Sequence, residues 1–151
     1  MNDQPKRRIL VIANETVEGG VLYEAMCVRA RSVRSVEVLV IAPALNSRVR
    51  HWISDEDEAR RGAELRLGKC LDRLSAADIE ASGWVGDADP LQAISDGLHL
   101  FAADEIIIAT HPEGRSHWLA RNLVGRARAR YPQPILHVVV DVAGGQQYVA
   151  A

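Results

Sequence analysis

The stretch from Thr110 to Ser116 has the composition of an anion-binding loop. It follows an apolar run typical of a buried strand, and Gly114 allows the backbone to approach a ligand closely. Arg115 and the hydroxyls of Thr110 and Ser116 can donate hydrogen bonds to a phosphate, and a helix that starts after the loop adds unpaired N–H groups. The alternative is a left-handed turn at Gly114, with Arg115 solvated and Ser116 only capping the helix.

Two earlier loops carry further groups suited to a nucleotide. Asn14, Glu15 and Thr16 follow the first apolar run, and their side chains can hydrogen-bond with a ribose or a base. Asn46 and Arg48 follow the second run, close to a tryptophan, and arginine beside an aromatic ring suits a stacked base or a phosphate. The plainer interpretations are a capping turn in the first loop, and surface arginines above a packed tryptophan in the second.

Signatures of several enzyme classes are absent from the sequence. It contains no GxxxxGK[ST] phosphate loop, no GxGxxG after the first strand, no GxSxG elbow and no HExxH. His111 lies next to Thr110 and can be imagined as a general base, but no cysteine or carboxylate lies at metal-ligand spacing from it. We therefore expect no metal site, no identifiable catalytic residue and a binding protein rather than an enzyme. His99 and His137 are interpreted as structural histidines.

Length and charge place the chain in an ordinary class. Its 151 residues suggest one domain, and a net charge of -2 gives no positive field for nucleic acid. Cys27 and Cys70 fall in helical patterns rather than at metal or redox spacing, which suits buried thiols in a reducing compartment. The first apolar run is too short for a membrane span or a signal sequence, so we expect a cytoplasmic protein that does not contact a membrane.

Short apolar runs alternate with helical periods along the chain. Near-continuous apolar character predicts buried strands, whereas the more mixed run at 79–85 predicts an edge strand. The alternation predicts an α/β fold, a Rossmann-like three-layer α/β/α sandwich around a five-stranded parallel sheet. We expect one domain at 7–141 between flexible tails at 1–6 and 142–151. The predicted strands cover 9–13, 36–42, 79–85, 105–109 and 135–140, and the helical stripes lie at 21–28, 59–74, 91–101 and 119–131.

Two segments, 86–94 and 103–116, resemble the universal stress protein family. The first is similar to the family's Gly-Asp-Pro turn with its following helix, and the second to its fourth strand and glycine-rich loop. In ATP-binding members the signature is Gly, two residues, Gly, nine residues, Gly, then Ser or Thr. Here Ala109 stands at the first glycine, Gly114 fits the second after a longer spacer, Val124 replaces the third and Gly125 replaces the hydroxyl residue. The ATP-binding signature is therefore degraded.

The resemblance implies the adenine-nucleotide alpha-hydrolase-like fold with strand order 3-2-1-4-5. That order puts the loops after the first and fourth strands on either side of the point where the strand order reverses, where ligands bind in such sheets. The ligand it implies is ATP, AMP or another adenine nucleotide. The expected ligand-binding residues are Asn14, Glu15, Thr16, Asn46, Arg48, Thr110, His111, Gly114, Arg115, Ser116 and Gly125.

The resemblance also implies a homodimer that forms through the last strand, 135–140, whose apolar edge is otherwise exposed. A module of this kind acts in stress response or signalling through protein contacts. Two alternatives stay open from the sequence. One is a ligand-free homodimeric interaction domain, favoured by the altered glycine signature, and the other is a nucleotide-processing enzyme that uses His111.

Overall fold

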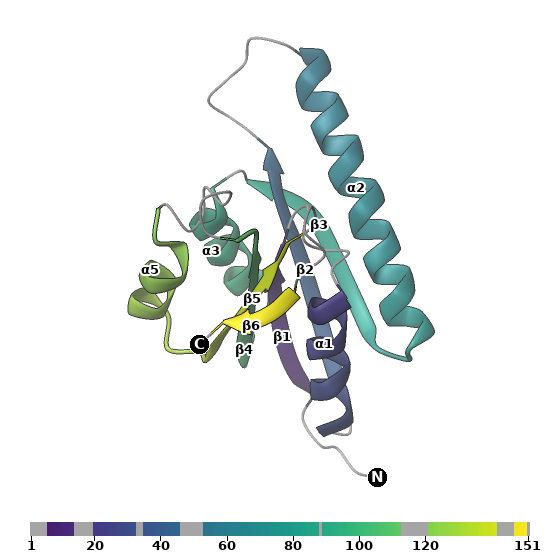
Figure 1. Ribbon diagram of the computed structural model, residues 1–151, viewed down its shortest axis with the longest axis vertical. Helices are drawn as coiled ribbons and strands as arrows, with labels where there is room; N and C mark the ends of the chain where they lie inside the picture. Colours follow the sequence, from purple (N-terminus) through teal and green to yellow (C-terminus); the bar gives the residue numbers. More distant parts are fainter. Residues whose placement is uncertain are drawn as a thin grey trace.

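A twisted sheet with strand order β3-β2-β1-β4-β5-β6 forms the centre of the protein (Figure 1). The computed structural model describes residues 6–13, 20–32, 35–45, 53–87, 89–112, 121–141 and 147–150. The first five strands are parallel, which confirms the expected α/β fold and the order 3-2-1-4-5. The elements are β1 (Arg7–Ile12), α1 (Gly20–Ser32), β2 (Val36–Leu45), α2 (Ile53–Ala76), β3 (Glu80–Asp87), α3 (Pro90–Leu100), β4 (Glu105–Thr110), α5 (Leu123–Arg130), β5 (Ile135–Val140) and β6 (Gln147–Ala150).

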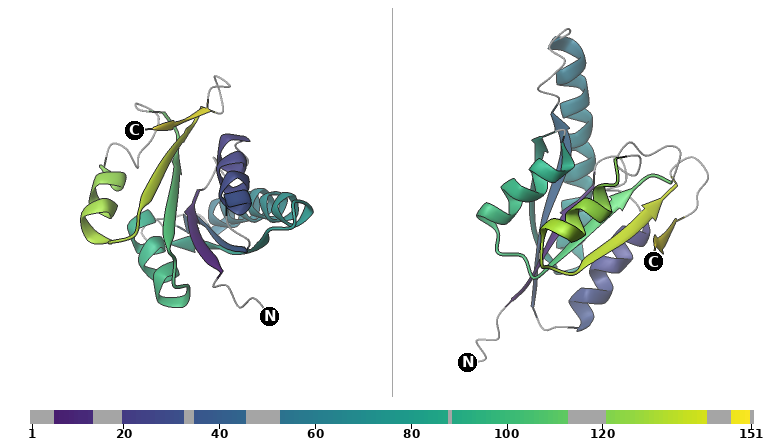
Figure 2. Two further views of the ribbon diagram at one scale, coloured as in Figure 1. Left: turned by 90° about the horizontal axis from the view of Figure 1, so that it is seen from below. Right: turned by 90° about the vertical axis from the view of Figure 1, so that its left-hand side faces the viewer.

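Helices cover both faces of the sheet, which makes three layers (Figure 2). Alternate residues of β1 and β4 enter two separate apolar clusters, because successive side chains of a strand point to opposite faces. Ile9 and Val11 pack in the cluster that contains residues of α1 and α2, whereas Leu10 and Ile12 pack in the cluster of α3 and α5. Burial on both faces explains why these strands are apolar at nearly every position.

The helices begin and end where local chemistry favours it. The Asp89 carboxylate accepts a hydrogen bond from the Leu91 N–H at 3.0 Å and caps α3, with Pro90 in the first helical position. The long helix α2 extends past the carboxyl end of the sheet (Figure 1). It ends before Asp78, whose φ of 60° lies in the left-handed region typical of a helix C-terminus.

The sheet has six strands rather than five. The additional strand, β6, comes from the segment 142–151 that we expected to be a flexible tail, and it pairs antiparallel with β5. It forms because the edge of β5 offers unpaired backbone groups, a tertiary cause that local composition does not reveal. At the opposite edge lies β3, as predicted. Two further boundaries differ: β2 continues to Leu45, beyond the predicted strand 36–42, and Thr110 ends β4 instead of opening the loop.

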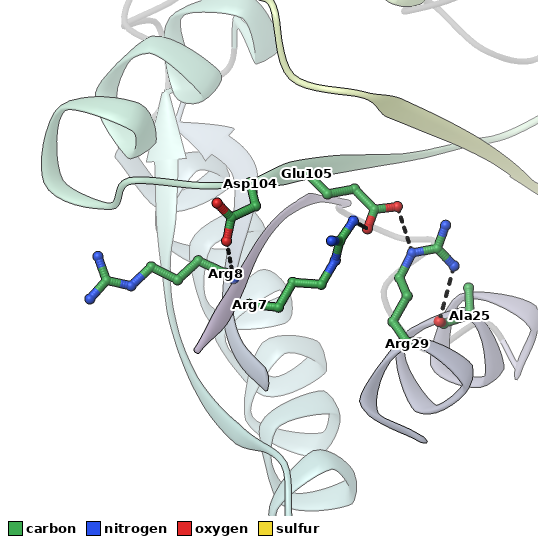
Figure 3. A network of polar contacts seen from close by, with 6 residues as sticks. All are labelled: Arg7, Arg8, Ala25, Arg29, Asp104 and Glu105. Atoms are coloured by element: carbon green, nitrogen blue, oxygen red, sulfur yellow. Dashed lines mark hydrogen bonds and ion pairs between the residues drawn. The ribbon is translucent and has the colours of Figure 1, made fainter. Parts of the chain in front are cut away.

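A buried carboxylate ties three elements together at the amino end of the sheet (Figure 3). Glu105, the first residue of β4, accepts hydrogen bonds from Arg7 of β1 and from Arg29 of α1. Arg29 also donates to the Ala25 carbonyl at 3.4 Å, within its own helix. The Glu105 side chain is 6% exposed, so these two ion pairs satisfy a charge that has little access to water. The network attaches the C-terminal part of α1, where Arg29 lies, to the sheet. Gly20 is the first residue of α1, at the other end of the helix from Arg29.

Candidate functional site

The strand order reverses between β1 and β4, at the centre of the sheet. From β1 the chain passes through α1 to β2 on one side, and from β4 it passes through α5 to β5 on the other. The two strands pair in parallel up to Ile12 opposite Ile108, and β4 continues to Thr110. In open α/β sheets, ligands usually bind where the connections diverge from neighbouring strand ends in this way. Ala13 and His111 therefore flank the candidate site.

Thr110 brings a hydroxyl to the end of β4. Its side chain is on the face of the sheet covered by α3 and α5, because Ile106 and Ile108, at alternate positions, pack in that cluster. The Thr110 Oγ1 lies 2.8 Å from Nε2 of His137, and both residues are buried. From the sequence, this hydroxyl was expected to hydrogen-bond with a phosphate. In the structure it already has a hydrogen-bond partner inside the protein, His137.

His137 interrupts the apolar run of β5. It pairs in register with Ile108, two residues before Thr110, so its imidazole reaches diagonally toward the carboxyl end of the sheet. Burial, and then the positive charge of Arg128, lower the pKa of His137 below its ordinary value of 6.5. The imidazole is therefore neutral at neutral pH, which fits the structural histidine expected at this position. Its contact with the candidate ligand-binding residue Thr110 depends on the pairing of β4 with β5, which local sequence does not reveal.

Two other candidate residues are described at this end of the molecule. His111 follows Thr110 directly and is half-buried. Gly125 lies in the first turn of α5, just after Asn122, whose φ of 54° is left-handed. A Cβ at Gly125 would lie 2.6 Å from Asn122 Oδ1, so this glycine allows the Asn122 side chain to fold against the helix. The path from β4 through α5 places that turn on the carboxyl side of the sheet (Figure 1).

The remaining candidate residues lie outside the described part of the chain. The described residues therefore place three of the eleven candidates, Thr110, His111 and Gly125, along one path from the end of β4 to the start of α5. Those that are not described are Asn14, Glu15, Thr16, Asn46, Arg48, Gly114, Arg115 and Ser116.

The described residues show neither a metal cluster nor a membrane-spanning helix. Nowhere in the described ranges do three or more His, Cys, Asp or Glu side chains gather as they would around a metal ion. Likewise, none of the helices described is both long and apolar enough to cross a bilayer.

Several solved structures share this architecture at low sequence identity. A universal stress protein family member from Burkholderia pseudomallei aligns with a TM-score of 0.60 and 14% identity, over 86% of this chain and 93% of that one. An Arabidopsis thaliana family member with AMP bound aligns with a TM-score of 0.59 and 10% identity, over 91% and 94%. A universal stress protein in complex with cAMP aligns with a TM-score of 0.50 and 19% identity, over 93% of this chain and 100% of that one. No family model and no curated protein matches the sequence.

The chain thus has a universal stress protein-like fold. The resemblance recognised in segments 86–94 and 103–116 is confirmed at the level of the fold. In sheets of this order the crevice between β1 and β4 is the place where a ligand is held.

Proposed function

We propose that this protein binds an adenine nucleotide, or a related phosphate ligand, in the crevice between the carboxyl ends of β1 and β4. The observation that carries the proposal is the reversal of strand order between these two strands, beside which Thr110 and His111 are placed. Two proteins of the same fold hold AMP and cAMP, which supports an adenine nucleotide as the ligand. The bound nucleotide would then act in cytoplasmic stress response or signalling through contacts with other proteins.

Within this proposal, the undescribed residues have the roles that their chemistry suggests. Arg115 and Ser116 contact the phosphate together with the backbone at Gly114, and Arg48 adds a second positive charge. Asn14, Glu15, Thr16 and Asn46 hydrogen-bond with the ribose and the base. Gly125 contributes its backbone at the first turn of α5, where the absence of a side chain leaves room for Asn122.

The first experiment is to denature the purified protein and identify released small molecules by mass spectrometry. ATP, AMP and cAMP are then titrated into ligand-free protein by calorimetry, with Arg115→Ala as the test variant. Arg126→Ala is the matched control, because Arg126 is an exposed arginine on α5. We expect Arg115→Ala to weaken binding by about 10-fold or more, the loss typical of a charge-assisted hydrogen bond, and Arg126→Ala to leave it unchanged.

Two results would contradict nucleotide binding at this place. One is the absence of both released nucleotide and measurable binding at millimolar concentrations. The other is binding that Arg115→Ala leaves intact, which would move the ligand away from the loop after β4. Slow turnover of ATP that is lost in His111→Ala would instead favour the nucleotide-processing alternative.

We further propose that the protein forms a homodimer through the last strand of the sheet. The expectation that the edge of the strand 135–140 is exposed is wrong, because β6 covers the edge of β5 over residues 137–140. The dimer would instead form through the outer edge of β6, where Val149 is half-exposed. A second copy that pairs there would extend both sheets across a twofold axis. This surface would also serve the ligand-free interaction domain that the sequence leaves as an alternative.

Light scattering tests the dimer independently of any ligand. The chain has a mass of 16.6 kDa, and we expect twice that mass for the natural sequence at micromolar concentration. Val149→Lys should give the monomer mass, because a lysine on an edge strand opposes pairing with another chain. A monomeric natural protein, or a dimer that Val149→Lys leaves unchanged, would exclude this interface.

A further inference from the structure

The pair Thr110–His137 is an unusual feature at the ligand end of the sheet. Among the described residues the buried polar side chains are Glu105, Thr110 and His137. Glu105 lies at the amino end and is paired with arginines, whereas the other two meet at the carboxyl end, beside an apolar cluster. Burying polar groups costs free energy that an apolar pair would not, and the residues after His137 in β5 are all valines. The packing of the core therefore does not explain why Thr110 and His137 are polar.

The hydrogen bond between the two side chains can run in either direction. A neutral imidazole has one N–H and one acceptor nitrogen, and a threonine hydroxyl has one proton. If the Thr110 O–H donates to Nε2, its oxygen offers only lone pairs to an incoming anion. If Nε2–H donates to Oγ1, the hydroxyl proton is free to point elsewhere. Protonation of the imidazole enforces the second arrangement, because both nitrogens then carry hydrogens.

We propose that His137 is a positioning residue of the nucleotide site, which sets the direction of the Thr110 hydroxyl and makes anion binding at the end of β4 proton-linked. The inference rests on the proposed function, since it concerns the same site. An anion there stabilises the arrangement in which Nε2–H donates and the hydroxyl dipole turns its positive end toward the ligand. The protonated imidazole also adds a positive charge. The turned hydroxyl and this charge therefore both strengthen the binding of an anion.

The surroundings of His137 suit such linkage. The pKa of His137 is held below 6.5 by burial and then by Arg128 of α5. Among the described residues, β4 contributes the uncharged Thr110, β6 contributes the backbone of Ala150, and α1 packs on the other face of β5 with Val138 and Val140. Free protein therefore has a neutral His137 near neutral pH. Since both partners are buried, a charge at the strand end acts on them with little screening by water.

The probe for this linkage is cAMP. A phosphate monoester such as AMP has its own ionisation near pH 6, which would obscure the effect, whereas a cyclic diester keeps one negative charge throughout. We expect cAMP to bind the natural protein about 3- to 10-fold more tightly at about pH 5 than at about pH 7.5, the range of one net hydrogen bond. By reciprocity, saturating cAMP should raise the pKa of His137, followed by NMR of its imidazole, by the logarithm of the same factor.

Three variants separate positioning from a merely structural role. His137→Val suits a buried strand and should remove the part of the pH dependence that His137 causes, while Thr110→Val keeps the shape of threonine and should reduce the pH dependence. Thr110→Ser should restore it. His99→Gln is the control, because His99 is an exposed histidine on α3 that hydrogen-bonds its own helix at the Ser95 carbonyl.

The outcomes distinguish this inference from the proposed function. cAMP binding that does not change with pH, or a pH dependence that is equally large in His137→Val, overturns the linkage while nucleotide binding stands. If no cAMP binds at any pH, the linkage is overturned, whereas the proposed function is decided separately by the released small molecules and by the titrations with ATP and AMP. If His137→Val does not fold, the NMR titration of the natural protein decides: a higher pKa of His137 in the complex supports the inference, and an unchanged pKa overturns it.

Discussion

Replacement of Glu105 by glutamine should be among the most destabilising single changes at the amino end of the sheet. The carboxylate is 6% exposed and binds two guanidinium groups (Figure 3). Glu105→Gln keeps the shape of the side chain but removes the charge, so two arginines lose their partner. Breaking a buried ion pair costs about 3–5 kcal/mol.

The expected loss lies at the lower end of that range, at about 3 kcal/mol, because the arginines are not deeply buried. The Arg7 side chain is 40% exposed and the Arg29 side chain 25%, so each guanidinium can regain part of its hydration. For a chain of this length, the loss corresponds to a fall of roughly 6–12 °C in the melting temperature. Arg29→Met should cost more than Arg7→Met, because Arg29 is the less exposed partner.

Urea unfolding followed by circular dichroism measures these differences in the free energy of unfolding. The matched control is Glu64→Gln, since Glu64 pairs with Arg60 within α2 and both side chains are more than half exposed. This change should cost under about 0.5 kcal/mol, as is usual for a surface pair. A loss at Glu105 no larger than at Glu64, or a larger loss for Arg7→Met than for Arg29→Met, would refute the reasoning.

Three further predictions concern backbone geometry and titration. Gly83→Ala should lower the free energy of unfolding by about 2 kcal/mol in urea unfolding, because its Cβ would lie 2.4 Å from the Val40 carbonyl oxygen; an effect under about 0.5 kcal/mol would contradict that close contact. Asp78→Gly should raise the free energy of unfolding by about 1 kcal/mol and Asp78→Ala should not, since φ is 60° there; equal effects of the two would argue against the left-handed conformation. Because the pKa of His137 is lowered in the folded protein, the unfolded chain binds more protons than the folded chain as the pH falls below 6.5. The free energy of unfolding should therefore fall until the folded-state pKa is passed and then level off. In His137→Val, urea unfolding should lack this part of the pH dependence.

The sequence predicts the strands well because their burial on both faces leaves a strong signal. The run 135–140 coincides with β5, and the run at 105–109 differs from β4 by one residue. Order in the sheet is not contained in such runs, and it came from the resemblance of segments 86–94 and 103–116. The strand β6 escaped prediction for a physical reason. The segment Gln147–Ala150 is only four residues long, too short to indicate a strand even though it contains Tyr148 and Val149, and it pairs because the edge of β5 is there to receive it.

The candidate site divides in the same way between local and non-local causes. Thr110 and His111 could be selected because they follow an apolar strand, a relation between neighbours in the sequence. The partner of Thr110 lies 27 residues away, and its contact depends on the register of β4 with β5. A shift by one residue in that register would turn His137 to the opposite face, toward α1. The lone polar residue in an apolar strand was the signal available, and it indicated a buried hydrogen bond without identifying the partner.

Because the contact between Thr110 and His137 depends on the register, its stability depends on how firmly β4 and β5 are paired. The hydrogen bond between Thr110 and His137 exists only if β4 and β5 keep their pairing, and β6 supports that pairing by covering β5 from His137 to Val140. An exposed edge would leave β5 bonded on one side alone, and its residues would open more readily. Loss of β6 should therefore weaken protection of the Val138 and Val139 amides against hydrogen exchange before it affects β1 or β2. Equal protection with and without β6 would show that the core packing of β5 suffices to hold His137 in place.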